Sequence, residues 1–282
     1  MLRQRIVTAL VLVGLLLAAL TMSQAWPFAL LTLALIAAAG WEWGRLNQAS
    51  NALSMAMGAT LAVAGVWALS SAWHASAPPA FWWGGTVLWV VAGTIALRGG
   101  PTLWPRLPAA ARWLLGLLAL WLAWLAIAHA RTIGINFLLS TLCLVWMADV
   151  AAYFGGRALG KRKLAPSISP GKSWEGVWSG MVGVLLLALL WMWIDTRIAV
   201  DGPSLYSRLW QAQGWAVGAL GLLALCGLSV VGDLLESLVK RAAGAKDSSG
   251  LLPGHGGVLD RVDALLPMMP AAMALAAWSA GT

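Results

Sequence analysis

The sequence has few charged residues and almost no cysteine. Of its 282 residues, 10% are charged and 61% are hydrophobic, and the mean hydropathy is +0.81. This composition excludes an ordinary soluble globular domain. The two cysteines, Cys143 and Cys226, each lie inside an apolar run. They therefore offer neither a disulfide framework nor the ligand spacing of a zinc site.

Long apolar runs are what the sequence has instead. We predict an all-α polytopic membrane protein, because only helices and closed barrels satisfy their backbone polar groups in a bilayer. The basic start and apolar run of residues 1–20 also resemble a signal peptide, but no convincing A-x-A-like site follows, so we expect a retained first helix. About nine spans are predicted, near residues 6–22, 27–44, 52–73, 82–98, 112–130, 135–154, 176–194, 215–236 and 264–280.

The basic residues are distributed unequally between the two sides of these spans. With nine spans, 15 of the 18 lysines and arginines share a side with the N-terminus, and three (Arg131, Arg197, Arg208) lie on the other. Cytoplasmic loops carry the excess of such residues, so we expect a cytoplasmic N-terminus. Residues 1–130 then form about five N-terminal spans, and residues 131–282 a catalytic region with two cytoplasmic loops.

Two further features of the composition lead to expectations. The net charge of +8 is attributed to topology and to attraction of phosphates or anionic lipid head groups. Nucleic acid is not expected as a partner, since no segment could form a soluble recognition module. The sequence has 20 tryptophans, and interfacial anchoring is expected for those near segment ends: Trp26, Trp41, Trp43, Trp73, Trp82, Trp83 and Trp104.

The eighth span ends in a cluster of polar residues. Asp233, Glu236, Ser237 and Lys240 are spaced i, i+3, i+4 and i+7, so a helix places them on one face. Glu236 and Lys240 could simply pair on a solvated helix end. Asp233 follows a largely apolar run and lies deeper, and a carboxylate at that depth indicates a functional site.

The loop after this span combines basic residues with glycines. Lys240, Arg241 and Lys246 could neutralise phosphates, and glycines permit close backbone approach to a ligand. An ordinary mobile loop is the alternative, and His255 could be a metal ligand, a phosphate donor or neither. Asp260 and Asp263 would share a face of the ninth helix. They could complement the helix dipole, or with Asp233 hold a hard cation such as Mg²⁺.

A second cluster follows the sixth span. Asp149, Tyr153 and Gly156 share a helical face, and the segment SISPGKSWEG begins at Ser167. The GKS in it suggests a P-loop, but Pro166 stands where a glycine is required and no strand is predicted before it, so we reject that interpretation. Lys172 near a helix start remains a candidate phosphate contact. Metal-assisted phosphoryl chemistry is the class that survives, since we find no serine–histidine–acid arrangement.

These residues together resemble a known signature. Ser237, Lys240, Arg241, Lys246 and Asp247, followed by LPGHGGVLDRVD from Leu252 to Asp263, are similar at every position to the signature of phosphatidate cytidylyltransferases, also called CDP-diacylglycerol synthases. DVAAYFGGR from Asp149 and SISPGKSWEG resemble a second region of that family. Gly171 stands where the family often has lysine, and Ser173 where it often has threonine.

The resemblance implies a reaction and a site. Phosphatidic acid and CTP would give CDP-diacylglycerol and pyrophosphate, with Mg²⁺, a second cation such as K⁺, and a homodimer in the inner membrane of a bacterium, its site facing the cytoplasm. Asp233, Asp260 and Asp263 would hold metal, and Asp233, Asp260, Lys240 and Lys172 would be catalytic. The substrate-binding residues implied are Asp149, Tyr153, Arg157, Ser169, Ser237, Arg241, Lys246, Asp247, His255, Gly256, Gly257 and Arg261.

Two other functions fit the sequence less well. In a transporter or lipid flippase, Asp149 and Asp233 would line an ion path, but the charges cluster on one side and no two halves of the sequence mirror each other. A CDP-alcohol phosphotransferase would share the chemistry and change the lipid. The spaced aspartate pattern expected of that class is not found.

Overall fold

The computed structural model describes residues 2–281, with side chains from residue 6 onward. The side chains of Arg3 and Arg5, which were counted for the topology, lie outside the described residues, as does Met1.

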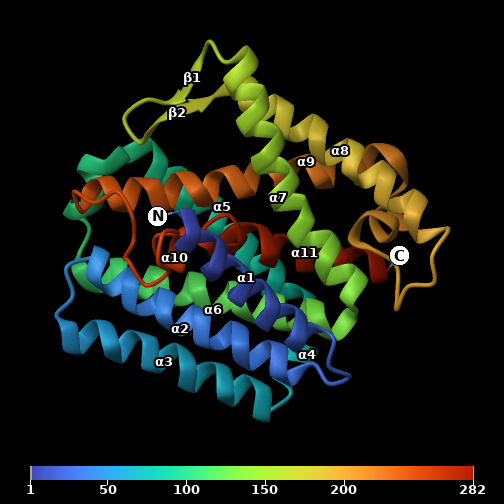
Figure 1. Ribbon diagram of the computed structural model, residues 1–282, viewed down its shortest axis with the longest axis horizontal. Helices are drawn as coiled ribbons and strands as arrows, with labels where there is room; N and C mark the ends of the chain where they lie inside the picture. Colours follow the sequence, from blue (N-terminus) through green and yellow to red (C-terminus); the bar gives the residue numbers. More distant parts are fainter. Residues whose placement is uncertain (1, 282) are drawn as a thin grey trace.

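Helices make up most of the structure (Figure 1). Eight of them are long and apolar enough to cross a membrane, and the apolar part of the first, Ile6–Leu20, is shorter. The all-α polytopic fold is thereby confirmed. The long helices are α1 (Leu2–Leu20), α2 (Trp26–Leu46), α3 (Asn51–Ser70), α5 (Pro79–Leu103), α6 (Ala109–Ile133), α7 (Ile135–Leu159), α8 (Trp174–Asp195), α9 (Leu205–Ala242) and α11 (Leu265–Ala280); α4 (Trp73–Ser76), α10 (Leu259–Val262) and a 3₁₀ turn (Trp104–Arg106) are short.

Helix α11 lies at the centre of the bundle. It packs against α9, α5 and α6, and nearly all its residues from Leu266 to Ala276 are buried. A helix that is apolar on every side is stable only where protein or lipid surrounds it. The paired helices α7 and α8 instead stand at one edge of the bundle, where they contact α9 (Figure 1). Helix α9 and the segment formed by α10 and α11, which carry Asp233, Lys240, Asp260 and Asp263, are therefore held in place by the core.

Helix α9 is bent near its start. Gly214 has φ +72° and ψ 179°, so the helix consists of two pieces. The predicted span 215–236 begins directly after this bend. The preceding piece, residues 205–213, was not predicted as helical, and its Leu205, Tyr206 and Leu209 are buried. It therefore belongs to the core and is not part of a surface link.

A small hairpin joins α7 to α8, and the sequence did not predict it. Strand β1 (Lys163–Ala165) pairs antiparallel with β2 (Ser169–Ser173), with Lys163 opposite Ser173. The statement that no strand precedes the GKS motif was wrong, because β1 does and the motif itself is in β2. A P-loop is still absent, since these residues are extended and Ser173 instead caps α8 by accepting a hydrogen bond from Gly176 N at 3.2 Å.

Three of the tryptophans expected at the membrane interface are in the core. Trp43, Trp82 and Trp104 are at most 4% exposed. Trp43 Nε1 donates to the Arg112 carbonyl at 2.8 Å, and Trp104 Nε1 donates to Asn47 Oδ1 at 2.9 Å. Their position near helix ends reflects these contacts between helices. Trp26 and Trp83 are exposed, as anchoring requires.

Asn47 ties the end of α2 to the turn after α5, and this predicts the effect of its loss. Its side chain is fully buried, donates to the Trp43 carbonyl at 2.9 Å and accepts from Trp104. Asn47→Ala leaves the Trp104 N–H without an acceptor, so we expect a loss of about 1–3 kcal/mol, seen as a lower midpoint of thermal unfolding in detergent. Exposed Asn51→Ala is the control and should leave the midpoint nearly unchanged.

Candidate active site

A cavity of about 500 Å³ lies between α7, α8, α9 and β2, in the size range of small-molecule sites. A separate cavity of about 330 Å³ is lined almost wholly by apolar groups and contains none of the predicted site residues. Since phosphates require charged partners, the first is the candidate site. The predicted residues that line it are Asp149, Tyr153, Arg157, Ser169, Lys172 and Asp233.

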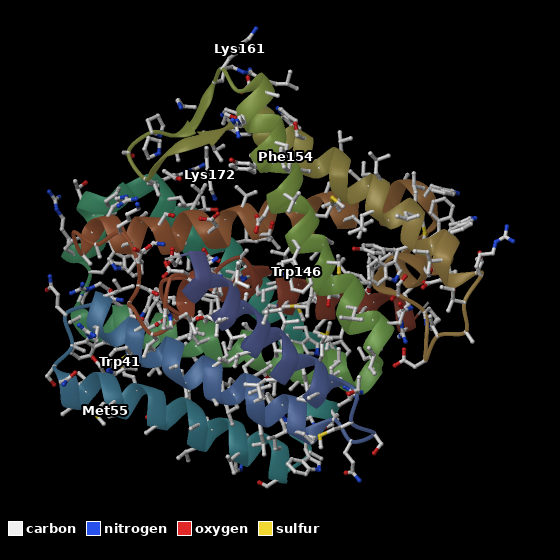
Figure 2. All side chains as sticks on the ribbon, viewed as in Figure 1. Trp41, Met55, Trp146, Phe154, Lys161 and Lys172 are labelled. Carbon is white, nitrogen blue, oxygen red and sulfur yellow. The ribbon has the colours of Figure 1, made fainter. Side chains whose placement is uncertain are left out.

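Lys172 connects the hairpin with α9. Its ammonium group forms an ion pair with Asp233, and about a third of each side chain is exposed. Figure 2 shows Lys172 beneath the hairpin, toward α9, whereas Lys161, in the link between α7 and β1, points away from the bundle. Asp149 on α7 interacts electrostatically with both members of the pair. The helix face predicted from the spacing of Asp149 and Tyr153 thus points into this cavity, together with Lys172.

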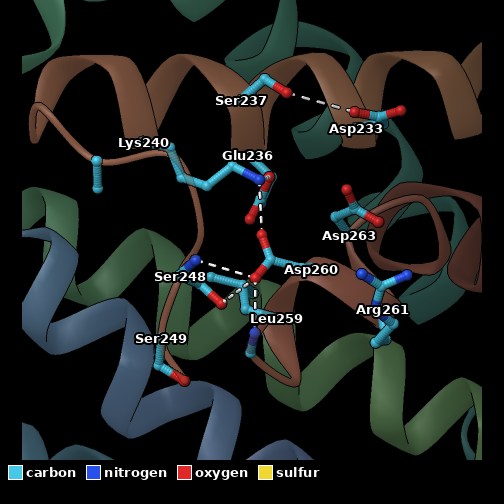
Figure 3. Close-up of polar contacts among 12 residues, drawn as sticks. Asp233, Glu236, Ser237, Lys240, Ser248, Ser249, Leu259, Asp260, Arg261 and Asp263 are labelled. Atoms are coloured by element: carbon cyan, nitrogen blue, oxygen red, sulfur yellow. Dashed lines mark hydrogen bonds and ion pairs between the residues drawn. The ribbon is translucent and has the colours of Figure 1, made fainter. Parts of the chain in front are cut away.

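Lys240 lies between two carboxylates. Its Nζ is 2.5 Å from Glu236 Oε2 and 2.6 Å from Asp260 Oδ1 (Figure 3). The pairing of Glu236 with Lys240 is confirmed, but the pair is not on a solvated helix end, because only 1% of the Glu236 side chain and 12% of the Lys240 side chain are exposed. One cation therefore serves two buried carboxylates, and such groups are costly unless they are paired.

Asp260 organises the loop between α9 and α10. Its Oδ2 accepts hydrogen bonds from Ser248 N at 2.9 Å, Ser248 Oγ at 2.8 Å and Gly257 N at 2.8 Å. Gly256 has φ +82°, a backbone conformation that favours glycine, and a Cβ there would lie 2.8 Å from Asp260 Oδ2. Glycines predicted to approach a ligand thus approach the chain's own carboxylates.

Asp263 lies beside Asp233. One of its oxygens accepts a hydrogen bond from Ala264 N at 2.8 Å, in accord with the helix-start interpretation, and its charge faces that of Asp233 (Figure 3). Ser237 is on the other side of Asp233, 3.4 Å from its Oδ1. Counting Asp149, Glu236 and Asp260 as well, five acidic side chains lie near Lys172 and Lys240, so acidic groups outnumber the lysines here.

This excess bears on the metal site expected from the sequence. Among residues 2–281, no group of three or more potential ligands is close enough to hold a metal ion. Mg²⁺ does not need three, because it commonly takes one or two carboxylates and completes its shell with phosphate oxygens and water. Asp233 and Asp263 provide oxygens of that kind. Asp233 already has two donors, on Lys172 and Ser237, whereas Asp260 has four, on Lys240, Ser248 and Gly257.

The remaining predicted residues lie around this centre. Arg241 Nε donates to the Ile168 carbonyl at 3.4 Å, which connects α9 to the hairpin, and Arg261 Nη2 donates to the His255 carbonyl at 2.5 Å. The buried Nδ1 of His255 has no hydrogen-bond partner among the described residues. Lys246 and Asp247 are exposed in the loop.

Sequence reasoning missed Glu42. This residue of α2 is fully buried and accepts hydrogen bonds from Val258 N at 3.0 Å and Leu259 N at 2.7 Å. An acidic residue inside the predicted span 27–44 was the available signal, because such residues are rare in membrane helices without a use. Its partners more than 200 residues later could not be read from the sequence.

Comparison with known proteins assigns the chain to a family. The sequence pattern of the cytidylyltransferase family matches residues 3–278. The chain belongs to this family. Cytidylyltransferases are nucleotidyltransferases, so the protein is an enzyme of that class.

Full-length relatives of this cytidylyltransferase carry a more specific name. A phosphatidate cytidylyltransferase of Pseudomonas aeruginosa is 40% identical over 289 residues, covering 100% of this chain and 98% of the relative. One from Haemophilus influenzae is 33% identical, with 96% of each chain covered. One from Brucella suis is 47% identical over 133 residues, covering 47% of this chain and 44% of its own. The family resemblance expected from the signature is confirmed.

The packing around Gly257 leads to a second prediction. A Cβ at this position would overlap Ser248 Oγ and the Glu42 carboxylate, so Gly257→Ala must displace the loop. We expect a lower unfolding midpoint and faster proteolysis of residues 243–258 in the cytidylyltransferase. Gly250→Ala changes the same loop where nothing lies within 4 Å and should behave as wild type. Equal behaviour of the two variants would contradict the packing described.

Proposed function

We propose that this cytidylyltransferase transfers CMP from CTP to phosphatidic acid, giving CDP-diacylglycerol and pyrophosphate. The observation that carries the proposal is the cavity in which Lys172 and Asp233 lie beside Asp149 and Arg157, next to the carboxylates around Lys240. Relatives covered over 96% or more of their length are phosphatidate cytidylyltransferases. The apolar helices explain how the acyl chains of a lipid substrate could stay in the bilayer.

The chemistry requires two polyanions to meet. An oxygen of the lipid phosphate attacks the α-phosphorus of CTP, the bond from that phosphorus to the bridging oxygen breaks, and pyrophosphate leaves. The second pKa of a phosphate monoester is about 6, so the nucleophile is largely ionised at neutral pH and needs no strong general base. This agrees with a site that contains cations and carboxylates but no histidine–serine pair. In this scheme Lys172 and Arg157 on the cavity wall, and Lys240 beside Asp260, are the basic residues that neutralise the reacting phosphates.

Asp233 and Asp263 fit a divalent cation by the chemistry of their oxygens and because the two side chains lie beside each other. A bound Mg²⁺ would supply neutralisation of the charge that develops on the phosphates. Asp260 remains a candidate ligand through Oδ1 if Lys240 moves. The protein itself orients the carboxylates: Lys172 forms an ion pair with Asp233, and Lys240 forms ion pairs with Glu236 and Asp260.

We place the reaction at the cytoplasmic face of an inner membrane of a bacterium, where CTP and Mg²⁺ are available, and expect the homodimer that the resemblance implies. The excess of lysine and arginine in the links on one side of the predicted membrane, the side that carries the two loops of the site, supports the orientation. A K⁺ requirement is tested by replacing K⁺ in the assay buffer with a large organic cation. Chemical cross-linking in native membranes tests the dimer.

Asp233→Asn is the substitution that tests the reaction most cleanly. Asp233 forms an ion pair with Lys172 and accepts a hydrogen bond from Ser237, whereas Asp260 also holds a loop through backbone amides. Purified wild type should form CDP-diacylglycerol from CTP and phosphatidic acid, lose this activity in EDTA and regain it with Mg²⁺. Loss of one electrostatic stabiliser typically lowers kcat about 10²–10³-fold, and we expect a fall of that size.

Asp201→Asn is the matched control. Asp201 accepts backbone hydrogen bonds at the start of α7, at the other end of the bundle, and its loss should leave kcat unchanged. Activity of wild type that survives EDTA would contradict the role of metal. Substrate-dependent ion flux in liposomes without consumption of CTP would instead favour a transporter.

The predicted orientation can be measured by cysteine labelling. Ser167 and Val200 are exposed and lie in links on opposite sides of the predicted membrane. In a background without Cys143 and Cys226, an impermeant maleimide should label Val200→Cys in intact spheroplasts and Ser167→Cys only after permeabilisation, because the basic loops are cytoplasmic. The reverse pattern would place the site outside.

A further inference from the structure

Glu42 is a buried carboxylate without a cationic partner. It comes from α2, in the N-terminal region, and none of the salt bridges among the described residues involves it. A buried charge of this kind is costly unless hydrogen bonds satisfy it. The donors that do so all belong to one segment, residues 248–259, which also contains the loop glycines.

Each oxygen of Glu42 fixes part of this segment. Oε1 accepts from Val258 N at 3.0 Å and from Ser249 Oγ at 2.5 Å, and Oε2 accepts from Leu259 N at 2.7 Å. Two consecutive backbone amides bound by a single carboxylate define both the position and the direction of the chain at the start of α10. The next residue after these amides is Asp260.

Asp260 holds the same segment from the opposite side. It accepts from Gly257 N and from both the amide and the hydroxyl of Ser248. The Ser248 hydroxyl is also 3.3 Å from Glu42 Oε2, so the two carboxylates lie on either side of one loop. Gly257 fits between them because it has no side chain. A shift of the segment therefore moves Asp260 and, through it, Lys240.

We propose that Glu42 is a positioning residue for nucleotidyl transfer: it holds residues 248–259 so that Asp260 and Lys240 keep their places in the site, and it does not touch either substrate. This inference rests on the proposed function for its activity readout. It gives the N-terminal helices a part in the chemistry, beyond enclosing the catalytic region.

Glu42→Gln tests the proposal, because it keeps the size of the side chain and replaces one acceptor oxygen with an N–H₂ group that faces a donor. Misplacement of a reacting group by about 1 Å can cost about 10²-fold, and we expect kcat to fall by about that factor with the KM values for CTP and phosphatidic acid changing less than tenfold. Amide hydrogen exchange should become faster in residues 248–262 and stay as in wild type in α7 and α8.

Asp195→Asn is the matched control for a merely structural role. Asp195 also accepts four hydrogen bonds, from Asn136 Nδ2, from the amide and hydroxyl of Ser204, and from Ser207 Oγ, and it lies at the far end of α8. The Asp195→Asn variant should have a lower unfolding midpoint and faster amide hydrogen exchange near residues 195–207, with kcat unchanged. Should Glu42→Gln fail to fold, Ser249→Ala removes a single donor and should lower kcat a few-fold with faster local exchange.

Three results would overturn the proposal: a kcat within twofold of wild type in Glu42→Gln, exchange in residues 248–262 that is unchanged, or exchange that rises uniformly through all helices. The first two would show that the segment does not depend on Glu42, and the third that Glu42 serves the whole fold. If wild type forms no CDP-diacylglycerol, the proposed function fails, and the exchange measurement still decides whether Glu42 holds the segment.

Discussion

The cost of burying carboxylates in an apolar protein is the constraint on which this structure depends. Four of the carboxylates in or beside the site, three of them buried and Asp233 partly exposed, are satisfied in three ways. Glu42 has hydrogen bonds and no cation, Glu236 and Asp260 share Lys240, and Asp233 is paired with Lys172. Removing one partner of a buried charge leaves the other uncompensated, which is far more destabilising than the pair itself is stabilising. Replacing one charged residue of the site therefore also affects the residue that is paired with it.

These ion pairs and hydrogen bonds keep their geometry only if both partners are carried by rigid elements. Lys240 is one helical turn beyond Glu236, so α9 sets their separation without any help from the loop. Asp263 precedes α11, the most enclosed helix of the bundle, and the end of α2 is held by Trp43, Asn47 and Trp104. The flexible-looking, glycine-rich segment between α9 and α10 is thus bounded by core helices and fixed by carboxylates on both faces.

Much of this could be predicted from the sequence where the information was local. The spacing of Asp233, Glu236 and Lys240 predicted a shared face, and apolar runs predicted the long helices. Information that depends on distant residues could not be recovered. The hairpin depends on Glu175 accepting from the amides of Lys161 and Arg162, a contact that neither strand's composition suggests. Tryptophans near helix ends look alike in sequence whether they face lipid or, as Trp43 does, another helix.

Glu42 and Asp260 both hold the segment 248–259, and the single hydroxyl hydrogen of Ser248 shows how their roles differ. It can be donated to one acceptor at a time, and Asp260 Oδ2 at 2.8 Å is closer than Glu42 Oε2 at 3.3 Å. Glu42 then depends on the two amides and Ser249, that is, mainly on backbone N–H groups, which every residue type except proline would provide at positions 258 and 259. Asp260 depends partly on a side chain, and its other oxygen faces Lys240. Glu42 therefore fixes the course of the backbone, while Asp260 is held partly by the side chains of Lys240 and Ser248, which can change rotamer without moving the backbone.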